Sequence, residues 1–223
     1  MAYRRTERVM QRLAARRDAI VAAAQLIASE SGMAAVQIVP VAARAGIAAG
    51  TVYRYFPAKS DLVAALMNAV SERELAAIRR AADAAPGPLS ALAAALTTFA
   101  ARVHANQTLA RAVFAEPVEG DVEAVRLACR RALADEFERR VRAATEGGHL
   151  PEQQAGPAAV ALTGALLEGL IGPLAPDTAD DAGKARGTVQ TLTLLSLRAL
   201  GVVDARARGL VVQTALPKRE DAA

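Results

Sequence analysis

The sequence contains few of the residues that build disulfides, metal sites or sheets. Among 223 residues there is one cysteine, Cys129, there is no tryptophan, and 3% of residues are aromatic. A single thiol excludes an internal disulfide framework and a zinc site built from several cysteines, and it is compatible with a reducing compartment. Aromatic residues favour strands and alanine favours helices, so this scarcity beside 56 alanines excludes an all-β fold and favours closely packed helices.

Long apolar runs are also missing. The most apolar stretch, residues 158–171, contains Glu168 and is bounded by Pro157 and Pro173, so it is shorter than the roughly 20 residues of a membrane-spanning helix. The first eighteen residues carry six arginines and lack the apolar segment of a secretory signal. We therefore expect an all-α protein that works in the cytoplasm.

Positive charge is concentrated near the N-terminus. Residues 1–60 hold nine basic side chains and three acidic ones, whereas the other 163 residues hold 18 basic and 20 acidic ones. A basic end on a slightly acidic body is typical of a chain whose N-terminal part meets a polyanion such as DNA. Arginine outnumbers lysine 24 to 3, however, so a compositional bias of the coding DNA is an equally good explanation of the charge alone.

Apolar periodicity and helix breakers predict about nine helices. In the first, over residues 8–29, Leu13, Ile20 and Ile27 recur every seven residues and form one apolar stripe. Short helices over 40–45 and 49–56 are separated by Gly46, and Ser60 is expected to cap a longer helix that runs to about residue 82. After the turn-rich segment 84–88, further helices are predicted over 89–105, 108–114, 122–146, 155–170 and 180–200.

Residues 40–56 have the layout of a helix-turn-helix. In the second short helix, Val52 and Phe56 are four residues apart and are expected to face inward. Ala49 and Gly50 on the other side have small or absent side chains, so the helix end can enter a major groove of DNA. This segment is therefore the predicted recognition helix.

Polar and aromatic groups continue the exposed face of this helix. Thr51, Tyr53 and Tyr55 can donate hydrogen bonds to phosphates or base edges. Arg54 can pair with guanine or phosphate, and the charge of Lys59 lies close to the flanking backbone. The alternative interpretation is that the tyrosines form the core of a small domain. We favour contact with DNA, because two of the three tyrosines lie beside Arg54 on one short helix.

A dense motif runs through residues 32–62. Its positions are Ala42, Ala45, Gly46, Ile47, Gly50, Thr51, Val52, Tyr53, Tyr55, Phe56, Lys59 and Leu62. This pattern resembles the DNA-binding segment of TetR-family transcriptional regulators, which typically show Ala, a spacer, Ala-Gly-Val, small residues, Thr-Leu-Tyr, an aromatic residue or His, Phe and Lys. The resemblance implies an all-helical protein with an N-terminal helix-turn-helix domain and a larger C-terminal helical domain.

The resemblance also implies further contacts with phosphates. Members of the family usually open each short helix with Ser or Thr, which caps the helix and reaches a phosphate, whereas this chain has Gln37 and Ala48 there. We include Gln37 among the DNA-binding residues. Phosphate anchoring is then expected to depend more on Arg4, Arg5 and Arg44, together with Tyr53 and Lys59.

The expected organisation is a DNA-binding domain at 1–70, an effector-binding and dimerisation domain at 71–205 and a flexible tail at 206–223. The helices containing residues 158–171 and 188–200 carry extensive apolar faces, and Gly164 and Gly169 permit close approach. Pairing them with a second copy would give a four-helix bundle and a homodimer. An ordinary buried core helix is the alternative for 158–171. A dimer would hold two recognition helices about 34 to 36 Å apart on a palindromic operator.

A TetR-like C-terminal domain also implies a pocket for a small effector. Beyond the DNA-binding part the aromatic residues are Phe99, Phe114 and Phe137, so the walls must consist mostly of Ala, Leu and Val, and the effector is expected to be lipophilic. The further candidates for contact with the effector are Met67, His104 and Cys129. No cofactor is expected.

Two other functions remain open from the sequence. The helix-turn-helix can serve as a protein-docking module that does not read DNA, which is compatible with the missing Ser and Thr caps. An enzyme would need Cys129, His104 and His149 to assemble, but these residues share no helical spacing and the chain has no phosphate-binding glycine loop or nucleophile elbow. The acidic run at 116–123 lacks the pattern of a calcium loop. We therefore expect a non-enzymatic repressor of transcription without a catalytic or metal site.

Overall fold

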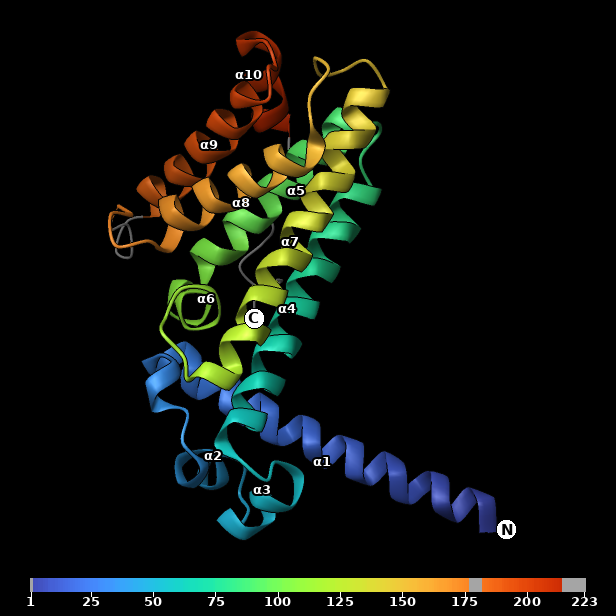
Figure 1. The fold of residues 1–223 in the computed structure, drawn as a ribbon, viewed down its shortest axis with the longest axis vertical. Coiled ribbons are helices and arrows are strands. Elements are labelled where there is room, and N and C mark those ends of the chain that lie inside the picture. Colours follow the sequence, from blue (N-terminus) through green and yellow to red (C-terminus); the bar gives the residue numbers. More distant parts are fainter. Residues whose placement is uncertain (1, 177–181, 214–223) are drawn as a thin grey trace.

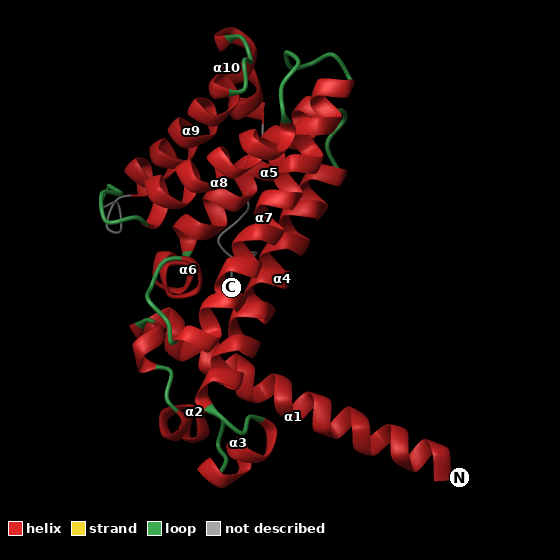
Figure 2. Ribbon diagram, viewed as in Figure 1, coloured by secondary structure: helices red, strands yellow, loops and turns green. Residues whose placement is uncertain are grey.

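The computed structural model describes residues 2–176 and 182–213, and of residues 2–8 and 182 it describes the backbone alone. All the regular secondary structure of these residues is helical, with ten α-helices and one short 3-10 helix (Figure 2). The predicted all-α fold is confirmed.

The N-terminal end of the chain forms a small group of helices at one end of the molecule (Figure 1). Their bounds are α1 (Ala2–Ser31), the 3-10 helix η1 (Met33–Ala35), α2 (Ile38–Arg44), α3 (Ala49–Tyr55) and α4 (Lys59–Asp83). Helix α4 leaves this group and runs along the long axis of the molecule, so it belongs to both halves of the fold (Figure 1). The expected domain boundary at residue 70 falls inside this helix.

The larger half consists of six further helices. They are α5 (Pro88–Ala105), α6 (Gln107–Phe114), α7 (Gly120–Glu146), α8 (Ala155–Ile171), α9 (Ala182–Ala199) and α10 (Asp204–Gln213). Helices α4 and α7 lie side by side along the long axis, and α8 and α9 pack on the side that faces away from α4 (Figure 1). Helix α6 is short and lies where the larger half meets the N-terminal group of helices.

One continuous apolar core joins the two halves. It includes Ile20 of α1, Phe56 after α3, Leu66 of α4 and Phe137 of α7, all of which are almost fully buried. Two charged contacts also hold α4 to its neighbours. Arg102 Nε of α5 donates to Glu74 of α4 at 2.6 Å, and Arg79 Nε of α4 donates to the buried Glu136 of α7 at 2.9 Å. The upper part of α4 is therefore fixed to α5 and α7.

Two expectations about the start of helices were wrong. Helix α4 begins at Lys59, and the carboxylate of Asp61, not the hydroxyl of Ser60, caps it by accepting a hydrogen bond from the Ala58 N–H at 2.9 Å. Helix α1 begins well before residue 8, and Leu13 is 44% exposed although Ile20 and Ile27 on the same stripe are buried. The apolar stripe extends beyond the part of the helix that the body covers.

The expected flexible tail at 206–223 is helical over residues 206–213, which belong to α10. Ala207 and Val211, four residues apart, are buried against the body. Asp204 in the first turn accepts hydrogen bonds from Arg208 Nε at 2.9 Å and from Arg198 Nε of α9 at 2.6 Å. These contacts hold α10 against the body, although the weak apolar periodicity of its sequence did not predict a helix. Residues 214–223 lie outside the described residues.

Candidate nucleic-acid interface

A tight turn sets the relation between α2 and α3. Gly46 adopts a φ of 66°, in the left-handed region that favours glycine, and the next residue, Ile47, donates its N–H to the carbonyl of Ala42 at 3.0 Å. Val41 and Ala42 of α2 are buried beside Val52 of α3. The two short helices are thus held as one helix-turn-helix unit, as the sequence predicted.

The inner face of α3 anchors it to the domain. Val52 is fully buried and Phe56, which follows the helix, is 2% exposed. The guanidinium of Arg17 lies 5.1 Å from the centroid of the Phe56 ring, within the range of a cation–π contact. The prediction that Phe56 belongs to the core is therefore confirmed.

The outer face of α3 is open to solvent. Tyr53 is 52% exposed, and Arg54 and Gly50 are also exposed. A Cβ built on Gly50 would meet no other described atom within 4 Å, so the chain's own packing does not require glycine there. Tyr55 differs from this group because it is partly buried and packs against the core. Ala49 and Thr51 are half-buried at the start of the helix.

Three further candidates for contact with phosphate already have partners. Both terminal nitrogens of Arg44 donate to Glu30, at 2.8 and 2.6 Å, and this hydrogen bonding lowers the pKa of the Glu30 carboxyl below its ordinary value. Lys59 Nζ lies 3.6 Å from a carboxylate oxygen of Glu119. Gln37 Nε2 donates to the carbonyl of Ala34 at 3.0 Å. All of these contacts are at the surface, where a phosphate can replace the partner.

The side chains of Arg4 and Arg5 lie outside the described ones. Sequence reasoning missed two exposed arginines of α1, Arg12 and Arg16, which were counted in the charge but assigned no contact. It also gave no role to Val39 of α2, which is 69% exposed beside the helix-turn-helix.

A contact between the two halves of the molecule was also missed. The carboxylate of Glu116, in the segment between α6 and α7, accepts a hydrogen bond from the Met33 N–H at 2.8 Å. The preceding Gly32 has a φ of 79°, and a Cβ there would lie 3.0 Å from Glu116 Oε1. The segment after α6 is thus fitted closely against the turn that leads into α2. No short-range pattern in the sequence joins positions so far apart.

Five of the six effector candidates are buried, and they form two groups, three phenylalanine rings and the pair of Met67 and Cys129. The ring of Phe99 meets those of Phe114 and Phe137 edge-on, with centroids 6.3 and 5.9 Å apart. Cys129 Sγ lies 3.8 Å from the carbonyl oxygen of Met67, and burial raises the pKa of the Cys129 thiol. His104, the sixth candidate, is half-buried at the end of α5. The five buried side chains occupy the space between α4, α5, α6 and α7.

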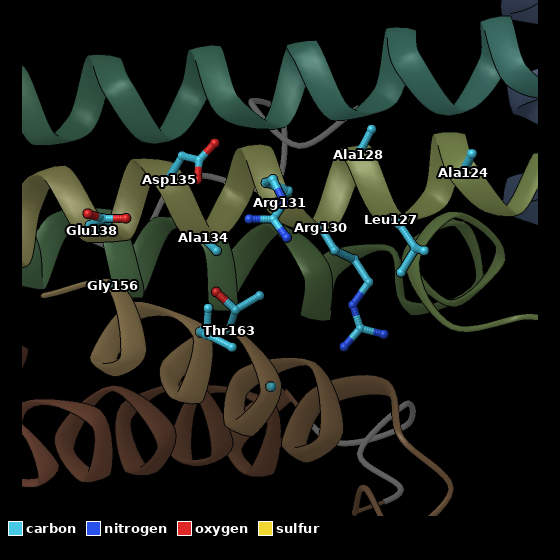
Figure 3. Close-up of a pocket in the computed structure, with 12 residues that line it drawn as sticks. Ala124, Leu127, Ala128, Arg130, Arg131, Ala134, Asp135, Glu138, Gly156 and Thr163 are labelled. Carbon is cyan, nitrogen blue, oxygen red and sulfur yellow. The ribbon is translucent and has the colours of Figure 1, made fainter. Parts of the chain in front are cut away.

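An open groove of about 690 Å³ lies instead between α7 and α8 (Figure 3). None of the six effector candidates lines it. Its walls include Leu127 of α7 and Val160 of α8, which are 54% and 63% exposed, and Gly164. Arg130 and Arg131 project from α7 beside it (Figure 3).

Within the described ranges, none of the helices combines the length and the apolar character needed to cross a bilayer. In the same part of the chain, no three or more His, Cys, Asp or Glu side chains gather in a way that could hold a metal ion.

The segment that contains the helix-turn-helix matches a known protein family. Residues 20–66, from the middle of α1 into α4, match the model of the bacterial regulatory proteins of the tetR family. The helix-turn-helix of this chain is of the TetR type. The matched segment contains both the turn at Gly46 and the open face of α3.

Curated relatives agree over a limited length. The chain is 44% identical over 77 residues to the HTH-type transcriptional repressor KstR of Mycolicibacterium smegmatis, and the match covers 34% of this chain and 38% of that protein. The KstR repressor of Mycobacterium tuberculosis is 42% identical over 77 residues, which cover 34% of this chain and 35% of its own length. This chain therefore spans little more than a third of the relatives it matches.

Solved structures share the whole fold at lower identity. The complex of RolR with resorcinol has a TM-score of 0.68 at 22% identity and covers 94% of this chain and 98% of that one. The fatty acid degradation regulator FadR of Bacillus halodurans has a TM-score of 0.70 at 21% identity, with 84% and 97% covered. The SmeT–triclosan complex has a TM-score of 0.69 at 24% identity, with 92% and 98% covered. These similarities establish the fold of the larger half as well.

Proposed function

We propose that this chain is a ligand-responsive transcriptional repressor that binds DNA as a homodimer. The observation that carries the proposal is the solvent-exposed outer face of α3, with Gly50, Tyr53 and Arg54 open, within the segment that matches the family. The KstR relatives are named as HTH-type transcriptional repressors, and the match to them supports repression as the outcome of binding. The function rests on binding, and no catalytic step is part of it.

The proposed contact with DNA places α3 in a major groove. Ala49 and Gly50 allow the start of the helix to approach the bases, and Thr51, Tyr53 and Tyr55 supply hydroxyl groups along it. Arg54 projects farther along the exposed face and can pair with guanine or with a phosphate.

Charged residues around the helix-turn-helix, and two arginines near the N-terminus of α1, would hold the flanking phosphates. We assign this role to Arg4, Arg5, Gln37, Arg44 and Lys59. Contacts of this kind fix the position of the protein on the duplex and make its affinity depend on salt. Since Arg44 and Lys59 already face carboxylates, each must exchange a carboxylate for a phosphate on binding.

The proposed dimer uses α8 and α9, which contain the apolar faces at 158–171 and 188–200. Val160 of α8 and Leu195 of α9 are large apolar side chains that are 63% and 55% exposed, so a second chain has apolar surface to cover on both helices. Gly164 has open space where a Cβ would lie, so a second chain can approach there. Gly169 serves a different purpose, because a Cβ there would lie 2.8 Å from Leu192 Cδ2 of the same chain.

The proposed effector is a small lipophilic molecule. Proteins of the same fold are described in complex with resorcinol, with triclosan and with stearoyl-CoA, which all carry apolar parts. The site we propose lies among Met67, Phe99, Phe114, Cys129 and Phe137, with His104 as the polar group at its edge. The three rings contact one another, Cys129 contacts Met67 and all five side chains are buried, so a bound effector would have to displace one or more of α4, α6 and α7.

The consequence for DNA follows from linkage. An effector that binds better to an arrangement with displaced α4 and α6 shifts the protein toward that arrangement. Because α4 leads directly from the helix-turn-helix, its displacement changes the separation of the two recognition helices in the dimer. The coupling is reciprocal, so bound DNA weakens binding of the effector by the same free energy by which the effector weakens binding of DNA.

The function is tested by selecting duplexes from a random library and titrating the selected DNA with salt. Arg54→Ala is expected to weaken binding by roughly 10- to 100-fold and to relax the preference for one base pair. Lys59→Ala is expected to weaken binding of all sequences similarly and to reduce the slope of log affinity against log salt by about 2, one contact being lost in each chain of the dimer. Arg80→Ala, an exposed arginine on the upper part of α4, is the control and is expected to match the wild type.

Two results would overturn the proposal. Failure of the library to yield any preferred duplex would favour the docking of a protein by the helix-turn-helix, an interpretation that the absence of a side-chain cap at Gln37 of α2 keeps open. Unchanged affinity and salt slope in Lys59→Ala would remove its assigned contact with phosphate.

A further inference from the structure

The N-terminal part of α1 projects from the body as a free helical arm (Figure 1). Every residue from 9 to 19 is exposed, and the first buried position is Ile20. Eleven residues of α-helix extend about 16 Å. The family model begins at residue 20, so this arm lies outside the segment matched to TetR proteins.

The arm has a fixed position relative to the recognition helix. Its C-terminal continuation is locked into the core by Ile20, Ala24 and Ile27. At the base of the arm, the Arg17 guanidinium lies over the Phe56 ring, directly after α3. The arm leaves the body at the end that carries α2 and α3 (Figure 1). A duplex seated against α3 therefore lies at the end of the molecule from which the arm extends.

The charge of the arm is mostly positive. Arg12, Arg16 and Arg17 lie within residues 9–19, and Asp18 is the acidic residue there. Arg12 and Arg16 are four residues apart and so lie on one side of the helix, where their like charges repel each other. Neither forms an ion pair with a side chain that the structure describes. A row of phosphates would relieve this repulsion, and a helix without tertiary contacts gains stability when a partner binds it.

We infer that residues 9–17 are a second DNA-binding element, with Arg12 and Arg16 on phosphates outside the reach of the helix-turn-helix. The inference rests on the proposed function and adds a binding element to it. An anionic membrane is the competing partner, because Val9 and Leu13 give the arm an apolar side with 50% and 44% exposure. DNA is the better partner of the arm. If the arm lay flat on a membrane, the open face of α3 would point toward the lipid headgroups and not toward a duplex.

The test compares full-length wild type with the double variant Arg12→Ala/Arg16→Ala on the selected duplex. Alanine preserves the tendency to form helix, and circular dichroism checks that helix content is retained. The control, Arg80→Ala/Arg131→Ala, removes two exposed arginines from α4 and α7 and so makes the same change in net charge. Affinity is measured between about 50 and 200 mM salt, the range over which phosphate contacts change it most visibly.

The expected result is a loss of at least roughly 10-fold in affinity at the lowest salt and a reduction of the salt slope by about 4 for the arm variant, because two arginines are removed from each chain of the dimer. The control is expected to be unchanged. Equal slopes for the arm variant and the wild type would overturn the inference while leaving the helix-turn-helix function intact. A second result would also overturn the inference. The wild type would sediment with phosphatidylserine vesicles, the arm variant would not, and the salt slope of DNA binding would be the same for both. If the wild type binds no duplex, the proposed function fails along with it.

Discussion

The carboxylate of Glu116 accepts a hydrogen bond from the backbone N–H of Met33, 83 residues earlier in the chain, at 2.8 Å. On the other side of α6, Arg111 Nε donates to the Ile171 carbonyl at 3.1 Å and Gln107 Nε2 donates to the Leu170 carbonyl at 3.0 Å. Helix α6 and the residue pair after it therefore connect the C-terminal end of α8 with the turn that precedes α2.

Replacing Glu116 with alanine is expected to destabilise the protein by about 1 to 3 kcal/mol, because the Met33 N–H loses a charged, partly buried acceptor. Glu116→Gln retains an acceptor oxygen and is expected to lose less. The free energy of unfolding is measured by urea denaturation. Glu119→Ala is the control, since Glu119 is exposed and faces Lys59 at the surface, and a loss there as large as in Glu116→Ala would contradict the role of the Met33 contact.

The helix-turn-helix was predictable because its signals are local. Gly46 ends α2 through its left-handed φ, Pro57 follows α3, and Val52 and Phe56 face inward four residues apart. Each of these depends on neighbours within one or two turns of helix. The cap of α4 was predicted wrongly for a related reason, because Ser60 and Asp61 are adjacent and only the backbone direction decides which side chain reaches the Ala58 N–H.

The contacts between distant segments were not predictable. Gly169 was expected to permit approach of a second chain, but its closest neighbour is Leu192 of the same chain, and which helix fills that space depends on the packing of α8 on α9. Leu13 belongs to the same apolar stripe as Ile20, yet the body ends between them. Periodicity identifies an apolar face without showing what covers it.

Neutralising Glu30 is expected to strengthen binding to DNA. Glu30 holds both terminal nitrogens of Arg44, and Glu30→Gln would release the guanidinium for a phosphate and raise affinity by roughly two- to fivefold at low salt. Arg44→Ala is expected to lower affinity, and Glu30→Gln combined with Arg44→Ala should behave as Arg44→Ala alone. An increase in affinity that persists in the double variant would contradict the competition.

The same pair predicts the direction of a pH effect. The hydrogen bond from Arg44 lowers the pKa of Glu30 in the folded protein, so the pair stabilises the fold above the ordinary carboxyl pKa, and that contribution is lost as the pH falls through the lowered value. The carboxylate therefore stays charged at neutral pH and continues to compete with phosphate. Titration of the Glu30 carboxyl by NMR, with Arg44→Ala as the comparison, is expected to show the higher pKa in the variant.

Breaking the pair between Glu74 and Arg102 is expected to cost more than any surface change. The two side chains are 13% and 5% exposed, so Arg102→Met leaves the Glu74 carboxylate with the more distant Arg73 Nε, at 3.8 Å, and is expected to destabilise the protein by about 3 kcal/mol. The double variant Arg102→Met/Glu74→Leu removes both charges and is expected to recover most of that loss in urea denaturation. A double variant as unstable as Arg102→Met would show that hydrogen bonding to other groups, not the unpaired charge, dominates.

Gly164 and Gly169 of α8 predict opposite results in the proposed dimer. Gly164→Leu meets no described atom of its own chain within 4 Å of the new Cβ, so the monomer is expected to fold with unchanged stability while the added side chain blocks a second copy. Gly169→Ala places its Cβ 2.8 Å from Leu192 Cδ2 and is expected to destabilise each chain by about 1 to 3 kcal/mol, because α9 must shift.

Sedimentation velocity over a range of concentrations measures the association of the two chains, and urea denaturation under monomeric conditions measures the stability of the fold. Val212→Asp, on the exposed side of α10, is the control and is expected to change neither. Since a palindromic site needs both recognition helices, Gly164→Leu should also weaken binding to the selected duplex, and a fully dimeric Gly164→Leu would place the interface elsewhere than on α8.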